Sequence, residues 1–190
     1  MRKLKINQFK ITMRKSIQFK AIALILFASV LSTALFAQKS AKPIASPRDS
    51  VSGKIGTSNV VINWGSPAVK GRKIWGGLVP YDKIWRTGAN PATTFETSND
   101  IKIKGKTLPA GKYSLFTIPG EKVWKIIFNS QTGQWGIKND GSANDDPSKD
   151  VLTVTVKPMK SKEFNERLTF KINKGFVLLW ENLAVPVKAK

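Results

Sequence analysis

The sequence predicts an all-β fold, an antiparallel β-sandwich of the immunoglobulin-like or jelly-roll-like kind. From residue 50 onward, apolar and polar residues alternate with a period of two over short segments, as in strands with one buried face. Turn residues separate these segments at intervals of about 8–12 residues, which is typical of a sandwich or barrel. Only 147–150 and 161–167 are compatible with a helical turn. We therefore expect a single β-sandwich domain over residues 50–190.

The expected strands follow from this alternation and from the turns between them. In residues 101–104, isoleucine and lysine alternate strictly, which predicts one buried and one solvated face. Hairpin turns are expected at 99–100, 119–122 and 173–175, where Gly, Pro, Asn or Asp residues interrupt the pattern. The expected strands are residues 51–55, 59–64, 93–98, 101–104, 112–118, 123–129, 151–157, 168–172, 176–180 and 183–187.

Residues 1–37 have the pattern of a secretory signal peptide. Residues 1–20 contain seven basic residues and no acidic residue, and residues 21–37 are uncharged and largely apolar. A basic segment, an apolar segment and a small residue before a polar one are typical of export signals, so we predict cleavage after Ala37. Residues 38–49 are then a polar, flexible lead-in to the domain.

Two alternatives to this interpretation of the N-terminus stay open. The apolar run is close to the minimum length that spans a bilayer, so an uncleaved membrane anchor is the alternative to a cleaved signal. Met13 begins a conventional signal peptide by itself, so translation can start there instead of at Met1. In the favoured interpretation the protein is exported, is periplasmic or extracellular, and has no transmembrane segment after cleavage.

The chain has no cysteine and no histidine, which excludes several kinds of chemistry. No disulfide can form, and no cysteine is available for a bacterial lipid anchor, so the fold must depend on its hydrophobic core. A Ser-His-Asp triad, a thiol nucleophile and the usual histidine or thiolate metal sites are also excluded. No phosphate-binding glycine loop is present. We therefore expect neither a cofactor nor a metal.

The formal net charge of +20 indicates a strongly basic surface. Such a surface attracts phosphates, anionic polysaccharides and acidic membrane faces. Alternatively, the lysines lie on solvated strand faces and prevent strand edges from pairing with other chains. The sequence has no recognition helix, zinc pattern or RNA-binding aromatic motif, and nucleic acid is not an expected partner.

One long loop, rich in Gly, Pro and aromatic residues, is the main candidate for function. Residues 65–91 contain five glycines and three prolines, alternate poorly, and are nevertheless too apolar for a disordered linker. Long loops in compact domains are often functional or packed on themselves, so this loop is where we look for a ligand-binding site. Its candidate binding residues are Lys70, Arg72, Trp75, Tyr81, Trp85, Arg86, Thr87 and Asn90.

The chemistry of this loop permits two interpretations. Trp75, Tyr81 and Trp85 can form a platform for sugar rings, and Arg86 can form a bidentate bond to a carboxylate or phosphate. Alternatively, Trp75 and Trp85 close one end of the core, and Arg86 satisfies loop carbonyls.

Several motifs of the chain resemble those of a known family. They are Ser46-Pro47-Arg48, residues 67–72, 75–81, 85–90, 108–116 and 134–136. On these motifs, the chain resembles the exported bacterial proteins of domain-of-unknown-function family 2911, from about residue 46 to its end. The resemblance implies secretion and a β-rich fold, and it implies no established activity.

The acidic residues do not form a recognisable catalytic or metal-binding pattern. Hydrolysis of a glycoside needs two facing carboxylates in a cleft, and the calcium loop needs a fixed ligand spacing. The candidates for a carboxylate pair are Asp82, Glu96, Asp100, Glu121, Glu163, Glu166 and Glu181; those for calcium are Asp140, Asp145, Asp146 and Asp150.

Three functions are compatible with these observations. The favoured one is a non-catalytic binding module for a glycan or an anionic partner. The second is a carboxylate-dependent hydrolase of an envelope polymer, and the third is a structural or assembly component of the cell envelope.

Overall fold

The structure is a computed structural model that describes residues 44–190. The predicted signal peptide and residues 38–43 of the lead-in lie outside the described residues. The first strand begins at Arg48, two residues before the expected domain boundary. The elements are β1 (Arg48–Ile55), β2 (Ser58–Gly65), β3 (Thr93–Thr97), β4 (Ile101–Ile103), β5 (Lys106–Leu108), β6 (Gly111–Ile118), β7 (Trp124–Asn129), the 3₁₀ helix η1 (Pro147–Lys149), β8 (Asp150–Val156), β9 (Met159–Ile172) and β10 (Gly175–Lys188).

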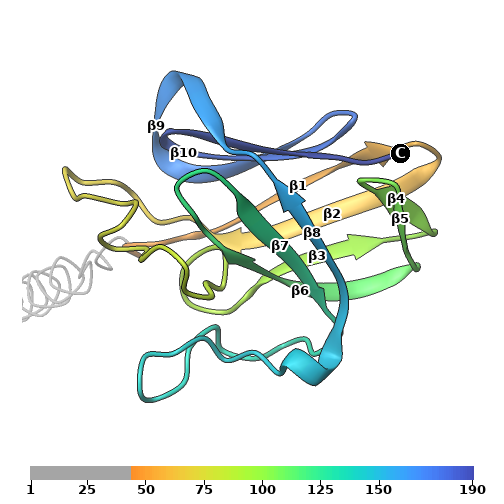
Figure 1. Ribbon diagram of the computed structural model, residues 1–190, viewed down its shortest axis with the longest axis horizontal. Coiled ribbons are helices and arrows are strands. Elements are labelled where there is room, and N and C mark those ends of the chain that lie inside the picture. The colour runs from red at the N-terminus through yellow and green to blue at the C-terminus, as the bar shows by residue number, and fades with distance from the viewer. Residues whose placement is uncertain (1–43) are drawn as a thin grey trace, which may run out of the picture. The chain divides into compact units, whose positions relative to one another are not determined.

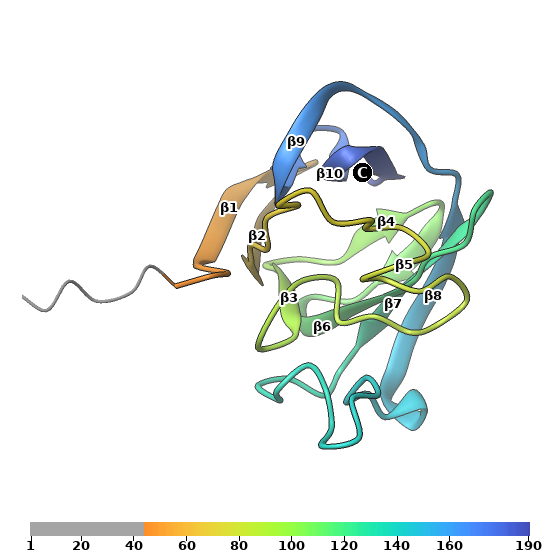
Figure 2. The same cartoon turned by 90° about the vertical axis from the view of Figure 1, so that its left-hand side faces the viewer.

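The strands form two unequal layers. Six of them build an antiparallel sheet in the order β1-β2-β3-β6-β7-β8, and β9 pairs with β10 in a long antiparallel ribbon. The ribbon covers one face of the six-stranded sheet, as Figures 1 and 2 show. The short β4–β5 hairpin lies beside the end of β10. Lys102 of β4 exchanges two backbone hydrogen bonds with Lys190, just after β10, and Lys104, just after β4, donates to Lys188. The prediction of an all-β, antiparallel sandwich is confirmed.

The alternating pattern produces the core between these layers. In β8, Leu152, Val154 and Val156 are buried, while the residues between them are exposed. Across the interface, the rings of Trp64 and Phe170 meet at 5.0 Å. Burial of each large apolar side chain stabilises the fold by about 1.5–3 kcal/mol, which is how a chain without disulfides reaches a stable core.

The predicted hairpin across residues 99–100 is wrong. β3 pairs with β2 and β6, whereas β4 pairs with β5, which the alternation did not reveal. The physical reason is a cluster of hydroxyl groups at the end of β3. Ser58 Oγ lies 2.7 Å from Thr97 Oγ1, and it also accepts a hydrogen bond from the backbone N–H of Asn99 at 3.0 Å. These bonds hold the end of β3 against β2, and the chain then leaves the sheet.

The polar segment 161–167 is part of strand β9 and not a helical turn. It pairs with β10 through two register shifts, around Glu181, whose φ is 52°. Pairing with a neighbouring strand therefore overrides the weak local preference of this segment. The same pairing joins the expected strands 176–180 and 183–187 into the single strand β10. The expected helical turn at 147–150 is present as η1.

Among residues 44–190, none belongs to a helix of the length and apolarity that crossing a bilayer requires.

Candidate anion-binding site

Residues 66–92 connect β2 to β3 without forming a further strand or helix. Backbone hydrogen bonds fasten this connection to both layers. Val69 N–H donates to Glu166 O at 2.7 Å, which ties its first part to β9. Trp85 and Thr117 exchange two backbone bonds, of 2.7 and 2.9 Å, which tie its second part to β6. The connection therefore has a defined position against the core.

Four tryptophans from this connection and from the two layers pack together. Trp85 stacks on Trp180 with ring centroids 6.0 Å apart, and Trp75 meets Trp124 edge to face at 5.1 Å. Trp124 and Trp180 are each only 1% exposed. Trp75 and Trp85 themselves meet at 79°, so they do not share one plane. This tryptophan cluster, residues 75, 85, 124 and 180, closes one end of the core.

A pocket of about 260 Å³ lies beside the tryptophan cluster. Its lining includes the aromatic side chains of Trp85 and Trp180, polar residues and two arginines, but no acidic residue. We call it the arginine pocket; its lining residues are Ser46, Pro67, Arg72, Leu78, Val79, Trp85, Arg86, Gly88, Ala89, Asn90 and Trp180.

Arg86 brings a charge into the pocket lining. Its Nε, like the Nε1 of Trp180, is buried and has no hydrogen-bond partner. Its aliphatic stem lies on Gly136, so closely that a Cβ at position 136 would be 2.0 Å from Arg86 Cδ. Burial lowers the pKa of Arg86 below its usual value, but a guanidinium stays charged in proteins. Between the described residues, Arg86 forms no ion pair. The pocket therefore holds a partly buried positive charge without a counter-charge.

Comparison with known proteins identifies the family of the chain. A family model described as "Protein of unknown function (DUF2911)" matches residues 46–189. The chain belongs to this family. No curated protein and no solved structure matches the DUF2911 chain.

Two further polar residues of the arginine pocket in this DUF2911 chain are held by the backbone. Arg72 donates from Nε to Val69 O at 3.1 Å and from Nη2 to Ala68 O. Asn90, with a φ of 65°, donates from Nδ2 to Ser46 O at 3.3 Å. These bonds shape the pocket wall, and the charge of Arg72 adds to the positive potential that Arg86 creates.

The other predicted binding residues lie outside the lining of the arginine pocket. Lys70 is exposed, and its backbone N–H donates to Glu166 Oε1 at 3.0 Å. Thr87 is fully buried and donates to Trp85 O at 3.3 Å. The ring of Tyr81 lies against Gly76, and Trp75 belongs to the tryptophan cluster. The structure thus brings together Arg72, Trp85, Arg86 and Asn90.

Sequence reasoning missed several residues of the site. Trp180 lies in the expected strand 176–180 and was not a candidate binding residue, yet it lines the pocket while being almost fully buried. Ser46 precedes the expected domain, and Leu78 and Val79 have no polar group to mark them. Gly136, which makes room for Arg86, gave a signal only as part of the motif 134–136.

The acidic side chains that the sequence offered as calcium ligands do not form a metal site among the described residues. Over residues 44–190, no three acidic side chains lie close enough together to hold a metal ion. Asp140 and Asp146 instead accept hydrogen bonds from Ser142 and Ser148, and these bonds lower the pKa of both carboxyl groups.

Proposed function

We propose that this protein is a non-catalytic binding module that takes a small anionic ligand in the arginine pocket. The observation that carries the proposal is the charge of Arg86 in a pocket whose lining holds no acidic residue. A partly buried charge without a counter-charge costs free energy. A bound anion supplies that counter-charge, because a guanidinium matches a carboxylate or phosphate through two parallel hydrogen bonds.

The remaining walls favour a ligand that carries its negative charge on a sugar or apolar body. Trp85 and Leu78 give the pocket lining apolar surface, and Asn90 adds a polar group. A volume of about 260 Å³ suits a ligand of the size of one monosaccharide. We therefore favour an acidic sugar, such as a hexuronate, over a long polymer segment buried along its length.

We also propose that this binding takes place outside the cytoplasm, because residues 1–37 have the pattern of an export signal. An acidic sugar of the periplasm or the cell exterior is then the class of ligand that the protein meets.

The alternative functions receive less support. A carboxylate-dependent hydrolase needs two acids in its cleft, and the arginine pocket has none in its lining. No single observation favours a structural role in the cell envelope over binding.

The proposal is tested by calorimetric titration of the full-length chain with galacturonate, with neutral galactose as the matched probe. At about −0.3 kcal/mol per non-hydrogen atom, a sugar acid of about 13 such atoms binds with a Kd of roughly 1 mM. We expect Arg86→Met to weaken galacturonate binding by about tenfold or more, because one charge-assisted hydrogen-bond pair is lost.

Lys83→Met is the matched control, since Lys83 is an exposed cation of the same connection that does not line the pocket. The affinity of the Lys83→Met variant for galacturonate should stay within about twofold of that of the unmodified chain, because an exposed charge outside the pocket is screened by salt. Equal binding of galactose and galacturonate, or equal weakening by both substitutions, would contradict the proposal.

A further inference from the structure

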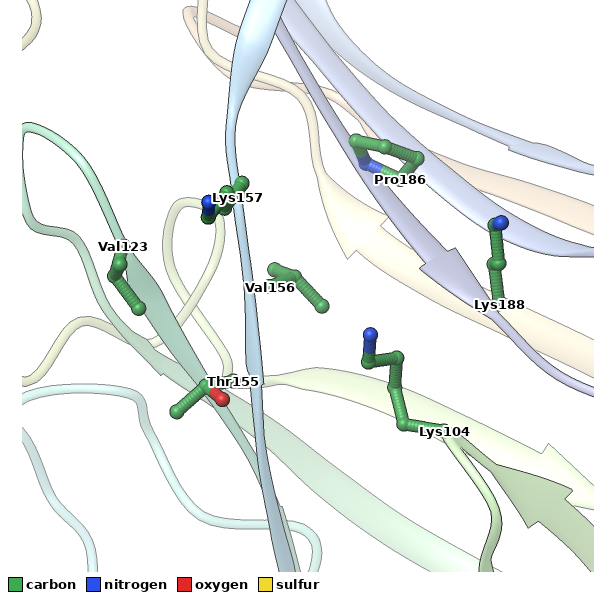
Figure 3. Close-up of a pocket in the computed structure, with 7 residues that line it drawn as sticks. All are labelled: Lys104, Val123, Thr155, Val156, Lys157, Pro186 and Lys188. Atoms are coloured by element: carbon green, nitrogen blue, oxygen red, sulfur yellow. The ribbon is translucent and has the colours of Figure 1, made fainter.

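The outer edge of β8 is not paired with another strand. In the six-stranded sheet β8 has one neighbour, β7, and Figures 1 and 2 show it at the margin of that sheet. Among residues 44–190, no backbone hydrogen bond joins residues 151–156 to a segment other than β7. A pocket of about 380 Å³, whose lining includes Val156 and Pro186, separates the end of β8 from β10 (Figure 3). Alternate N–H and C=O groups along this edge can therefore pair with an incoming strand.

The sequence of β8 does not protect this edge. Residues 151–156 alternate valine or leucine with threonine after Val151, and they contain no charged residue, proline or glycine. Free edges in natural proteins usually carry such residues, or a bulge, because an unprotected edge pairs with other chains. The irregularity in the pairing of β8 with β7 lies before Leu152, so the rest of the strand is regular. Uncharged, mostly β-branched segments are also those that pair most readily.

The other edge strands within residues 44–190 carry the protection that β8 lacks. β1, at the opposite end of the sheet, contains Arg48, Asp49 and Lys54. β9 contains six charged residues and pairs with β10 through two register shifts. β10 contains Pro186, and β4 and β5 are only three residues long. This contrast singles out β8 as the edge that is suited to pairing.

The side chains of β8 follow the same order in both directions from Val154. Leu152, Val154 and Val156 are buried on the core side, and Thr153 and Thr155 are exposed on the other side. Figure 3 shows Thr155 and Val156 on opposite sides of the strand. An antiparallel second copy centred on Val154 places Thr153 opposite Thr155 of the partner subunit, and Leu152 opposite Val156 of the partner subunit. Because opposed residues of paired strands share a face, apolar side chains then meet apolar ones, and threonines meet threonines.

The charges at the two ends of β8 favour the antiparallel direction. Asp150 begins the strand, and Lys157 follows its last residue. In an antiparallel pair each Asp150 lies near Lys157 of the partner subunit, whereas a parallel pair brings like charges together. The formal net charge of +20 opposes association of two copies, so we expect the pairing to tighten as salt screens this repulsion.

We propose that two copies of this chain form a symmetric dimer by antiparallel pairing of their β8 strands. The two six-stranded sheets then form one continuous sheet. A two-fold axis through the paired Val154 residues relates the copies, so each copy covers the β8 edge of the other and the contact is closed. The pairing uses no residue of the arginine pocket.

The competing occupant is an extended segment of a different protein, which an unpaired edge can also accept. Such a segment requires neither the symmetric order of side chains around Val154 nor the opposite charges at the ends of β8. A second copy of the chain accounts for both features.

Sedimentation equilibrium of the full-length chain between about 1 and 100 μM tests the proposal. We expect a monomer–dimer equilibrium whose Kd rises by at least about tenfold in the variant Thr153→Lys with Thr155→Lys, because the introduced lysines of the two copies oppose each other. In the variant Thr153→Lys with Thr155→Glu, each introduced lysine instead opposes an introduced glutamate of the partner subunit. The Kd of this second variant should stay within about threefold of that of the unmodified chain.

The matched control adds two charges to the opposite edge of the sheet, by Ser50→Lys with Ser52→Lys in β1, where both serines are exposed. The Kd of this variant should change by no more than about twofold, because distant exposed charges are screened by salt. All variants keep residues 1–37, so any association through that segment is the same in every sample. Circular dichroism confirms the fold of each variant.

A disulfide tests the register independently of charge. The chain has no cysteine, so a single introduced thiol can bond only its counterpart in a second molecule. Val154→Cys places two thiols opposite each other at the two-fold axis, and mild oxidation should link the two chains of the dimer. Leu152→Cys is the matched control, because its two thiols lie about four residues out of register, or about 13 Å apart along the strands, which is too far for a disulfide.

A chain that stays monomeric at about 100 μM overturns the proposal. Equal weakening by the two charged variants of Thr153 and Thr155 overturns it as well, and so does equal cross-linking of Val154→Cys and Leu152→Cys. Arg86→Met should leave the monomer–dimer equilibrium unchanged, so this inference and the proposed function succeed or fail separately.

Discussion

At the scale of single residues, Arg86 and Gly136 form one unit. The stem of Arg86 occupies the space that any larger side chain at position 136 would need, and Arg86 lines the arginine pocket. The sequence marked Arg86 as a candidate because an arginine in an aromatic loop suits an anion. It could not reveal Gly136 as its support, since the two residues are far apart in the chain and meet only through the fold.

Substitution of Gly136 by alanine tests this unit. Gly136→Ala should lower the free energy of unfolding by about 1–3 kcal/mol, because the new Cβ displaces the Arg86 stem. In the background of Arg86→Ala the same change should cost markedly less, since the stem is gone. Urea unfolding of the four proteins measures the coupling. Identical costs of Gly136→Ala in both backgrounds would show that the two side chains do not press on each other.

At the scale of elements, local pattern and long-range pairing had different predictive value. The buried alternation in β8 was evident from Leu152, Val154 and Val156, because a half-buried strand repeats every two residues. The strand formed by residues 161–167 was not evident from the sequence, because this segment is polar and gains its structure from pairing with β10. The turn predictions show the same contrast. The expected turns at 119–122 and 173–175 join paired strands. The expected hairpin at 99–100 does not form, because hydroxyl contacts of Ser58 hold the end of β3 and the chain then leaves the sheet.

The element around η1 should respond to acid. Ser148 donates to Asp146 Oδ1 from its backbone N–H at 3.0 Å and from its hydroxyl at 2.7 Å, and Ser142 bonds Asp140 in the same way. These bonds lower the pKa of both carboxyl groups below the ordinary value of 3.8. A lowered carboxyl pKa contributes stability above its unfolded value, and this stability is lost as the pH falls through the folded value.

We therefore expect the free energy of unfolding to fall as the pH drops below about 4, and to fall less steeply in the variant Asp140→Asn with Asp146→Asn. Urea unfolding between about pH 3 and pH 6 measures both slopes. Burial, with a smaller contribution from the charge of Asp146, raises the pKa of the neighbouring Asp145, which acts in the opposite direction, so both proteins are compared in an Asp145→Asn background. Parallel slopes for the two proteins would show that the serine bonds add nothing to stability.

At the scale of the whole molecule, the connection 66–92 both closes the core and lines the arginine pocket, the two interpretations that its sequence left open. Trp75 and Trp85 extend the core onto Trp124 and Trp180, while Arg86 and Asn90 line the pocket beside them. Composition and alternation sufficed for the fold class and the candidate loop. They could not supply the strand order or the walls of the arginine pocket, because these depend on which distant segments the two layers bring together.

The most direct test of the central claim follows the Nε–H signal of Arg86 by nuclear magnetic resonance while galacturonate is added to the full-length chain. Our account predicts that this signal shifts and saturates at about tenfold the expected Kd of roughly 1 mM, and that galactose leaves it in place. An Nε–H signal of Arg86 that stays unmoved by galacturonate at that concentration would contradict the account.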